Sequence, residues 1–90
     1  MQVSADISMY PLSTEYKAPI IAFIHRLREQ QGIRLRTNQL STQLTGEYAD
    51  VMEAIRVALE PSFASEFEMS VVIKLLNIPI NPNDTREVVV

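Results

Sequence analysis

The chain has 90 residues, 47% hydrophobic and 21% charged, which suits one folded domain with a thin core. A net charge of −3 without a cluster of Lys and Arg excludes phosphate-backbone binding as its main role, so we expect no nucleic-acid partner. The absence of Cys excludes disulfides, thiolate metal sites and a Cys nucleophile. No apolar run approaches the ~20 residues that span a bilayer, and we interpret the chain as cytoplasmic, without membrane insertion.

The first segment, residues 2–10, alternates apolar and polar side chains. This period of two predicts a half-buried strand, which Pro11 ends because it lacks a backbone N–H. The apolar side carries Val3, Ala5, Ile7 and Met9, and the polar side Ser4, Asp6, Ser8 and Tyr10.

A helix is expected to begin between residues 15 and 18, with Pro19 in its first turn. Its apolar stripe repeats at helical spacing and its polar side chains, Arg26 among them, face away. Gly32 is expected to end the helix. The stripe consists of Ile20, Phe23, Ile24 and Leu27.

Residues 33–45 predict a hairpin of two strands with a turn near Asn38 and Gln39. Two Arg side chains on residues 33–37 favour a place at the sheet margin, where charge discourages aggregation. The facing of the second strand stays open, because a one-residue slip exchanges its two sides. The possible inward sets are Leu40, Thr42 and Leu44, or Ser41, Gln43 and Thr45. Gly46 is interpreted as a turn or helix-entry glycine.

A second helix is predicted over residues 47–60, with Glu47 or Asp50 at its positive end and Pro61 and Ser62 closing it. Residues 68–76 alternate again and predict the last strand. The remaining residues hold two prolines and an Asn/Asp cluster, so we expect an extended tail lying on a neighbouring subunit.

The order strand, helix, strand, strand, helix, strand is that of the ferredoxin-like βαββαβ unit, an α+β fold. We therefore expect a four-stranded antiparallel sheet with two helices on one face, formed by residues 1–77, and an extended C-terminal tail, residues 78–90. The opposite face would be open and mixed in polarity, which favours pairing with a second copy. Its members would be Asp6, Ser8, Tyr10, Arg34, Arg36, Ser70, Val72 and Lys74.

Several functions common in this fold find no support in the residues. The hairpin lacks the aromatic residues that stack on RNA bases. His25 is the single histidine, so a metal site is not expected. No phosphate-binding, dinucleotide, nucleophile-elbow or zinc-protease motif occurs. We expect no enzyme, no catalytic residue, no metal and no cofactor, which leaves a binding or an assembly function.

Four segments together resemble the YkoF-related thiamine/hydroxymethylpyrimidine-binding family of small ferredoxin-like proteins. The most specific are the end of the first strand and the hairpin, and the similarity spans residues 2–77, with the tail outside it. The segments read "ISMYPL", "API" followed by "FIHRL", "RTNQLSTQLTGEY" and "VMEAI".

The resemblance implies a non-enzymatic protein that binds thiamine or its hydroxymethylpyrimidine moiety against the sheet, near a subunit interface. The founding type carries two such units in one chain, so this chain would act as a homodimer or a dimer of dimers. An aminopyrimidine needs fixed amide and hydroxyl groups in an otherwise apolar slot. The candidate ligand-binding residues are Ser8, Tyr10, Asn38, Ser41, Thr42, Gln43 and Glu47.

Each of these residues also has a purely structural interpretation. Ser41 and Thr42 are good strand residues, and Asn38 is a good turn residue. Glu47 suits a helix start, and Tyr10 an interface. The alternative function is a structural or regulatory homo-oligomerisation module with no small ligand.

Overall fold

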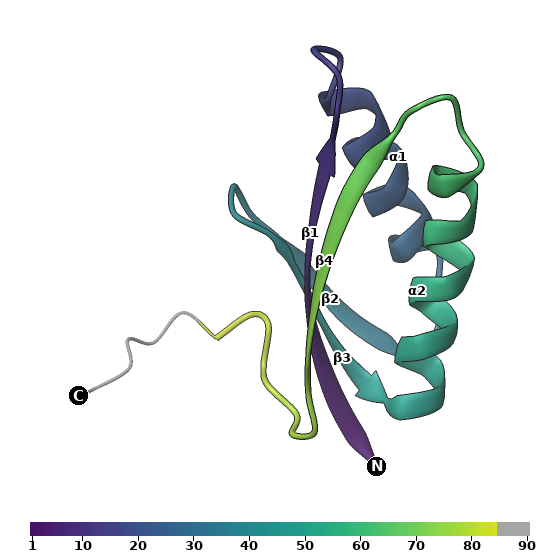
Figure 1. The fold of residues 1–90 in the computed structure, drawn as a ribbon. Helices are drawn as coiled ribbons and strands as arrows, with labels where there is room; N and C mark the ends of the chain where they lie inside the picture. The colour runs from purple at the N-terminus through teal and green to yellow at the C-terminus, as the bar shows by residue number, and fades with distance from the viewer. Residues whose placement is uncertain (85–90) are drawn as a thin grey trace.

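The computed structural model describes residues 1–84, so part of the predicted tail, residues 85–90, lies outside the described residues. Its elements follow the predicted order (Figure 1). They are β1 (Gln2–Pro11), α1 (Lys17–Arg28), β2 (Ile33–Thr37), β3 (Thr42–Glu47), α2 (Tyr48–Phe63) and β4 (Met69–Leu76).

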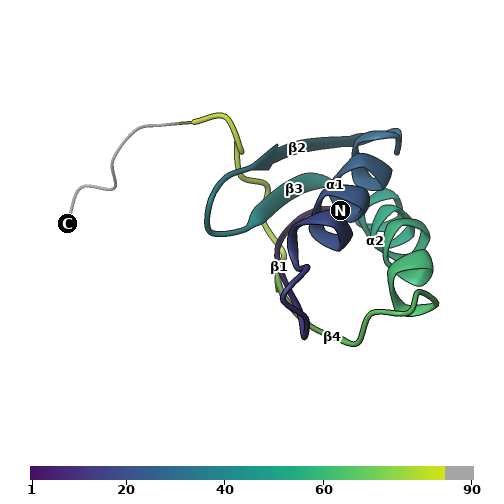
Figure 2. The ribbon, with the colours of Figure 1, turned by 90° about the horizontal axis from the view of Figure 1, so that it is seen from above.

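The four strands form one antiparallel sheet in the order β2-β3-β1-β4. Both helices lie on the same face of this sheet, as Figures 1 and 2 show. The α+β ferredoxin-like prediction is therefore confirmed, and β2 does lie at a sheet margin.

The core lies between the sheet and the helices. It is made by the predicted apolar side of β1, the stripe of α1 and one side of α2, because these surfaces face each other once both helices cover one face. Its buried members are Val3, Ala5, Ile7, Met9, Phe23, Leu27, Leu44, Val51, Ala54, Ile55 and Ala58.

The structure settles which side of β3 faces the helices. Leu44 pairs with Ala5, and Thr42 with Ile7, so both lie on the core side and are buried. Gln43 and Thr45 therefore face outward. Leu40 precedes the strand and is 87% exposed. Of the possible inward set Leu40, Thr42 and Leu44, only Thr42 and Leu44 therefore face the core.

Gly46 lies inside β3 and not in a turn or helix entry, which corrects the sequence interpretation. An added Cβ would stand 2.5 Å from the carbonyl oxygen of Gly32. The close approach of the loop before β2 is thus the reason that this position carries no side chain.

Helix α2 continues past its predicted end, because Pro61 lies within its last turn. The helix still ends regularly, with the Ala64 N–H donating to the Glu60 carbonyl at 3.0 Å. Proline fits a helical φ, and its cost here is limited to one missing hydrogen bond near the helix end.

Arg26 faces α2, although its place on the polar side of α1 predicted that it points away. Its Nε donates to the Ala58 carbonyl at 2.8 Å, and its Nη2 donates to the Ser62 hydroxyl. The guanidinium reaches sideways along its aliphatic stem and joins the two helices, which a period-based prediction does not detect.

The segment after β4 turns back across the outer face of its own sheet. The Ser4 hydroxyl donates to the Ile78 carbonyl at 2.8 Å and accepts the Ile80 N–H at 3.0 Å. Arg34 also donates to the Ile80 carbonyl at 3.4 Å, and Pro82 is buried. The expectation that this segment lies on a neighbouring subunit is therefore wrong for residues 78–82. A buried hydroxyl in the middle of a sheet requires such partners.

Replacing Ser4 by Ala should lower the free energy of unfolding by about 1–3 kcal/mol, because two backbone groups of the tail lose their partner. Urea denaturation monitored by circular dichroism measures this. Ser70→Ala, which removes an exposed strand hydroxyl, is the matched control and should change stability by less than about 0.5 kcal/mol. Equal stability of the two variants would contradict the role of Ser4.

Candidate functional site

Strand β1 extends beyond the end of the neighbouring strand β3. The β1–β3 ladder ends at the pair Ile7 and Thr42, whereas β1 continues to Pro11. The Tyr48 N–H donates to the Met1 carbonyl at 2.9 Å, and hydrogen-bonded pairs alternate along an antiparallel ladder. By this alternation the N–H and C=O of Met9 point to the side on which β3 has already ended.

A cleft of about 270 Å³ lies at this place, between the end of β1, the β2–β3 turn and α1. Apolar side chains of β1 and α1 line it together with hydroxyl and amide side chains of β1 and the β2–β3 turn. The lining residues are Ile7, Ser8, Met9, Tyr10, Ile20, Phe23, Ile24, Thr37, Asn38, Gln39, Leu40, Ser41 and Thr42.

The turn above the cleft is held by its own side chains. Asn38 Oδ1 accepts the N–H of Leu40 at 2.9 Å and of Ser41 at 3.1 Å. Gln43 Nε2 donates to the Ser41 hydroxyl at 2.6 Å and to the Asp6 carboxylate at 3.4 Å. Asn38 thus has the turn role that its residue type suggests, and Gln43 supports the rim from the outer face.

Thr42 lies on the core side of β3 and lines the cleft. It pairs with the Thr37 hydroxyl at 2.9 Å, and Thr42 is only 5% exposed. Either hydroxyl can be the donor of this pair. The pair can therefore present either a donor or an acceptor to a group placed beside it.

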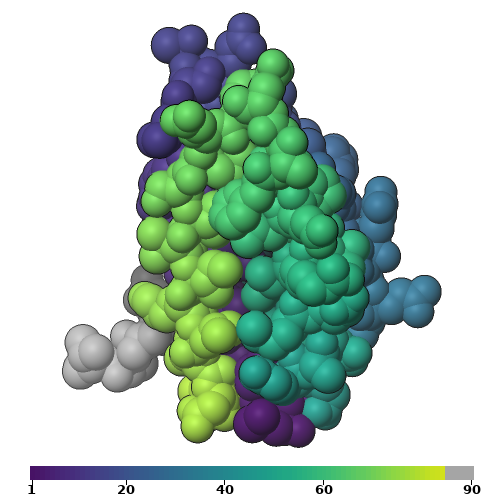
Figure 3. All heavy atoms as spheres, turned by 45° about the vertical axis from the view of Figure 1, so that its right-hand side comes forward, coloured from purple at the N-terminus to yellow at the C-terminus, as the bar shows by residue number. Residues whose placement is uncertain are grey.

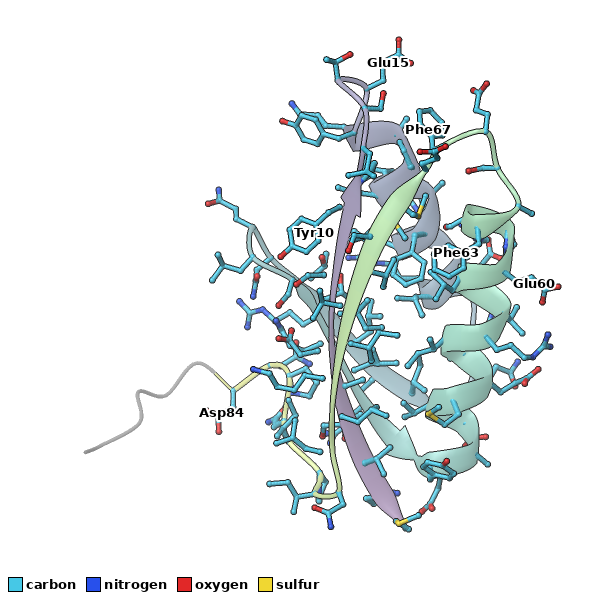
Figure 4. All side chains as sticks on the ribbon, in the orientation of Figure 1. Tyr10, Glu15, Glu60, Phe63, Phe67 and Asp84 are labelled. Carbon is cyan, nitrogen blue, oxygen red and sulfur yellow. The ribbon has the colours of Figure 1, made fainter. Side chains whose placement is uncertain are left out.

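Ser8 and Tyr10 carry the polar groups that are free to bind a ligand. Within residues 1–84, neither hydroxyl makes a hydrogen bond with the protein, and Tyr10 is 54% exposed. In Figure 4 the Tyr10 ring projects from β1 on the same side as the β2–β3 turn. An aromatic face and a free hydroxyl thus border the same cleft.

Glu47 lies at the opposite end of β3 and does not reach the cleft. Its carboxylate accepts hydrogen bonds from the N-terminal ammonium at 2.8 Å and from Gln2 Nε2 at 2.6 Å. The bond with the N-terminus, followed by the bond with Gln2, lowers the pKa of Glu47. This carboxylate is therefore occupied, and we leave it out of the candidate site.

Of the predicted ligand residues, the cleft brings together Ser8, Tyr10, Asn38, Ser41 and Thr42, with Gln43 directly behind them. Sequence reasoning missed the wall formed by α1, because its apolar stripe signals core packing alone. It also missed the open backbone of Met9, since a strand's free edge depends on where the neighbouring strand stops.

A larger hollow of about 480 Å³ lies between β4 and the start of α2. It is lined mainly by apolar side chains, including Val3, Tyr48 and Leu75. Tyr48 and Asn77 bring the only polar side chains among its lining residues, fewer than the hydroxyl and amide groups that line the smaller cleft. The smaller cleft is therefore the better candidate for a polar aromatic ligand.

Residues 1–84 contain no group of three or more His, Asp or Glu side chains that could hold a metal ion. In the same part of the chain, no helix has both the length and the apolar character to cross a membrane.

The fold is that of a small ferredoxin-like protein, and the candidate cleft lies where β1 extends past the end of β3. A family model described as thiamine-binding protein matches residues 5–86, and the chain belongs to this family. The match extends beyond Asn77, so the segment set apart as a tail lies largely within the family's domain. No curated protein matches the chain.

Solved structures agree on the fold. A Streptococcus pneumoniae protein is 23% identical with a TM-score of 0.78, covering 89% of this chain and 90% of its own. A hypothetical protein from Methanocaldococcus jannascii is 17% identical with a TM-score of 0.74, covering 93% and 88%. A Thermotoga maritima protein, provisionally named for thiamine biosynthesis or salvage, is 18% identical with a TM-score of 0.64, covering 81% and 82%.

Proposed function

We propose that this protein binds thiamine or its hydroxymethylpyrimidine moiety in the cleft at the end of β1, without catalysing a reaction. The family supports thiamine as the ligand class. The choice of this cleft as the site rests on one observation: Ser8, Tyr10, Ser41 and Thr42 line the same cleft, which also has an apolar wall. The protein acts in the cytoplasm as a homo-oligomer, with the site near a subunit interface.

The chemistry of the cleft matches an aminopyrimidine. Ring nitrogens accept hydrogen bonds from hydroxyl groups, and the exocyclic amine can donate to a backbone carbonyl such as that of Met9. The apolar face of the ring lies against Phe23 and Ile24. At about 270 Å³, the cleft is slightly smaller than the ~300–1,000 Å³ of sites for drug-sized ligands, which favours the one-ring moiety as the part inside.

Calorimetric titration with thiamine, its phosphates and hydroxymethylpyrimidine tests the proposal. We expect saturable binding of at least thiamine or hydroxymethylpyrimidine, and the absence of heat from every compound between micromolar and millimolar concentrations would overturn it. Hydroxymethylpyrimidine alone, added in excess, should also compete with thiamine.

Ser8→Ala should weaken binding about tenfold, because one free hydroxyl of the site contributes ~1 kcal/mol or slightly more. Ser70→Ala, which removes an exposed hydroxyl outside the cleft lining, should leave the Kd unchanged. Thr42→Val should also weaken binding with the oligomeric state unchanged. If Ser8→Ala and Thr42→Val both bind as the parent does, the ligand lies elsewhere.

The second candidate is an assembly module without a small ligand. The exposed apolar strand at the sheet edge favours it. A shifted oligomeric state in Thr42→Val, together with no response to any thiamine compound, would support this alternative.

A further inference from the structure

A half-buried carboxylate lies next to the cleft, on the outer face of β1. Asp6 precedes Ser8 by two residues, and residues two apart on a strand point to the same face, about 6.5 Å from each other. Asp6 Oδ1 accepts a hydrogen bond from Gln43 Nε2 at 3.4 Å. The same nitrogen donates to the hydroxyl of Ser41, which lines the cleft. One amide group therefore connects the carboxylate to the cleft lining.

No direct contact compensates the charge of this carboxylate. Among the side chains of residues 1–84, Asp6 has no ion-pair partner, and its Oδ2 accepts no hydrogen bond. Lys74 is its partner in the β1–β4 register, and Arg36 lies one strand beyond Gln43, but neither cationic group is in contact with it. A negative charge that is partly removed from water and has no cation in contact attracts a positive group of a ligand.

Asp6 belongs to a small surface on the outer face that we call the outer-face patch, formed by Asp6, Ser8, Tyr10 and Val72. Ser8 and its β4 neighbour Val72 lie in the middle, and Asp6 and Tyr10 lie at the two ends. Val72 is 56% exposed and Tyr10 54%, so both offer apolar surface to a flat ring. Strand β4 is last in the sheet order and lies along the molecular surface beside α2 (Figure 3), which leaves this side of the patch open.

The outer-face patch is continuous with the cleft, because Ser8 and Tyr10 belong to both. In Figure 4 the Tyr10 ring projects from β1 toward the β2–β3 turn and away from α2. A ligand with one ring in the cleft can therefore place a second ring, joined through a single carbon, on the patch. Asp6 lies one strand step beyond Ser8, which is within reach of such a ring.

We propose that the outer-face patch binds the second ring of thiamine, the positively charged thiazolium, with Asp6 opposite its charge and the Tyr10 ring beside it. The pyrimidine lies in the cleft, and the methylene group between the two rings passes over Ser8. Carboxylates and the faces of aromatic rings both stabilise organic cations. The protein therefore prefers thiamine to hydroxymethylpyrimidine, which has no such charge.

This assignment rests on the proposed function, because it requires the pyrimidine in the cleft. It adds which member of the proposed ligand class is preferred and which residues select it. Hydroxymethylpyrimidine reports on the cleft alone, whereas thiamine reports on the cleft and the patch. The ratio of their two dissociation constants therefore measures the contribution of the patch.

Calorimetric titration of the parent chain with both compounds at low salt gives this ratio. Thiamine should bind about tenfold more tightly, because the ion pair and the contact with the aromatic face each contribute about two- to fivefold. Sodium chloride at ~0.5 M should reduce this preference by screening the charges. Equal affinity of the two compounds overturns the patch and leaves the cleft in place. Binding of neither compound overturns the proposed function together with the patch.

Asp6→Asn removes the charge and keeps an oxygen for the Gln43 amide. It should weaken thiamine binding about fivefold and leave the affinity for hydroxymethylpyrimidine unchanged. Glu60→Gln is the matched control, because it makes the same change in net charge on α2, which lies on the other face of the sheet. It should change neither affinity. An Asp6→Asn chain with the parent's ratio, or an equal loss in Glu60→Gln, overturns the proposal.

Lys74→Gln should have an effect of opposite sign. The Lys74 ammonium belongs to the residue opposite Asp6 on β4, so it repels a cation on the patch. Its removal should tighten thiamine binding about two- to fivefold without changing the affinity for hydroxymethylpyrimidine. Arg36→Gln should act in the same direction but more weakly, because Arg36 is farther from the patch. Weaker thiamine binding by Lys74→Gln would contradict the position of the thiazolium.

Two substitutions at Tyr10 test the aromatic contact. Tyr10→Phe keeps the face of the ring and should keep the preference for thiamine. Tyr10→Leu removes the ring and should reduce the ratio about two- to fivefold. Circular dichroism checks that every variant is folded. An unchanged ratio in Tyr10→Leu overturns the role of the ring.

Discussion

Replacing Phe23 by Ala should lower the free energy of unfolding by about 3–5 kcal/mol. The ring is 2% exposed, belongs to the core cluster and forms part of the cleft wall. In a chain of 90 residues the core is thin, so the cavity left by one ring removes a large share of total stability. Urea denaturation of both proteins measures the change.

Ile24→Ala is the matched control for this experiment. Ile24 lines the same cleft but is only half-buried, so its truncation should cost clearly less than that of Phe23. Phe23→Leu should recover most of the lost stability, because it refills most of the cavity. A cost for Phe23→Ala below about 1 kcal/mol would show that the ring is not part of a packed core.

Gly46→Ala should lower the free energy of unfolding by about 1–3 kcal/mol. The sign is informative, because exchanging Gly for Ala at an unstrained strand position normally stabilises a protein by about 0.4–1 kcal/mol. Here the added methyl meets the Gly32 carbonyl oxygen at 2.5 Å, and a backbone atom cannot move aside as a flexible side chain can. The midpoint of thermal unfolding should fall accordingly.

A Gly46→Ala protein as stable as the parent would contradict the close approach of the two chain segments. Ser70→Ala serves again as the control, because it changes a strand residue that is exposed and lies on β4. If both variants lose stability equally, the loss does not come from the clash at Gly32.

Most of the fold follows from short-range patterns. The alternation in β1 and β4, the helical period of α1 and α2 and the hairpin pattern of β2 and β3 identify the six elements, and their order selects the ferredoxin-like arrangement. The incorrect predictions concern side chains whose hydrogen-bond partners lie far away in the sequence. Arg26 reaches the Ala58 carbonyl, and Ser4 holds the Ile78 carbonyl, and neither partner can be found from periodicity.

Part of the candidate site was also predictable from the sequence. Ser8, Tyr10, Asn38, Ser41 and Thr42 were chosen as polar residues of the first strand and the hairpin that suit the ligand implied by the family resemblance, and the structure brings these five side chains together. Glu47 was included because of its residue type. Its separation from the others follows from the ladder, in which it pairs with Gln2 at the far end.

The amino-acid sequence by itself determined the elements, their order and the amphipathic surfaces that must meet, because these depend on residues a few positions apart. Only the tertiary structure decided the facing of β3, the end of its ladder at Thr42 and the exposure of the β4 edge. These features depend on strand register and on which element lies beside which. Register changes with a one-residue shift that leaves the local pattern intact, so the pattern alone carries too little information to select it.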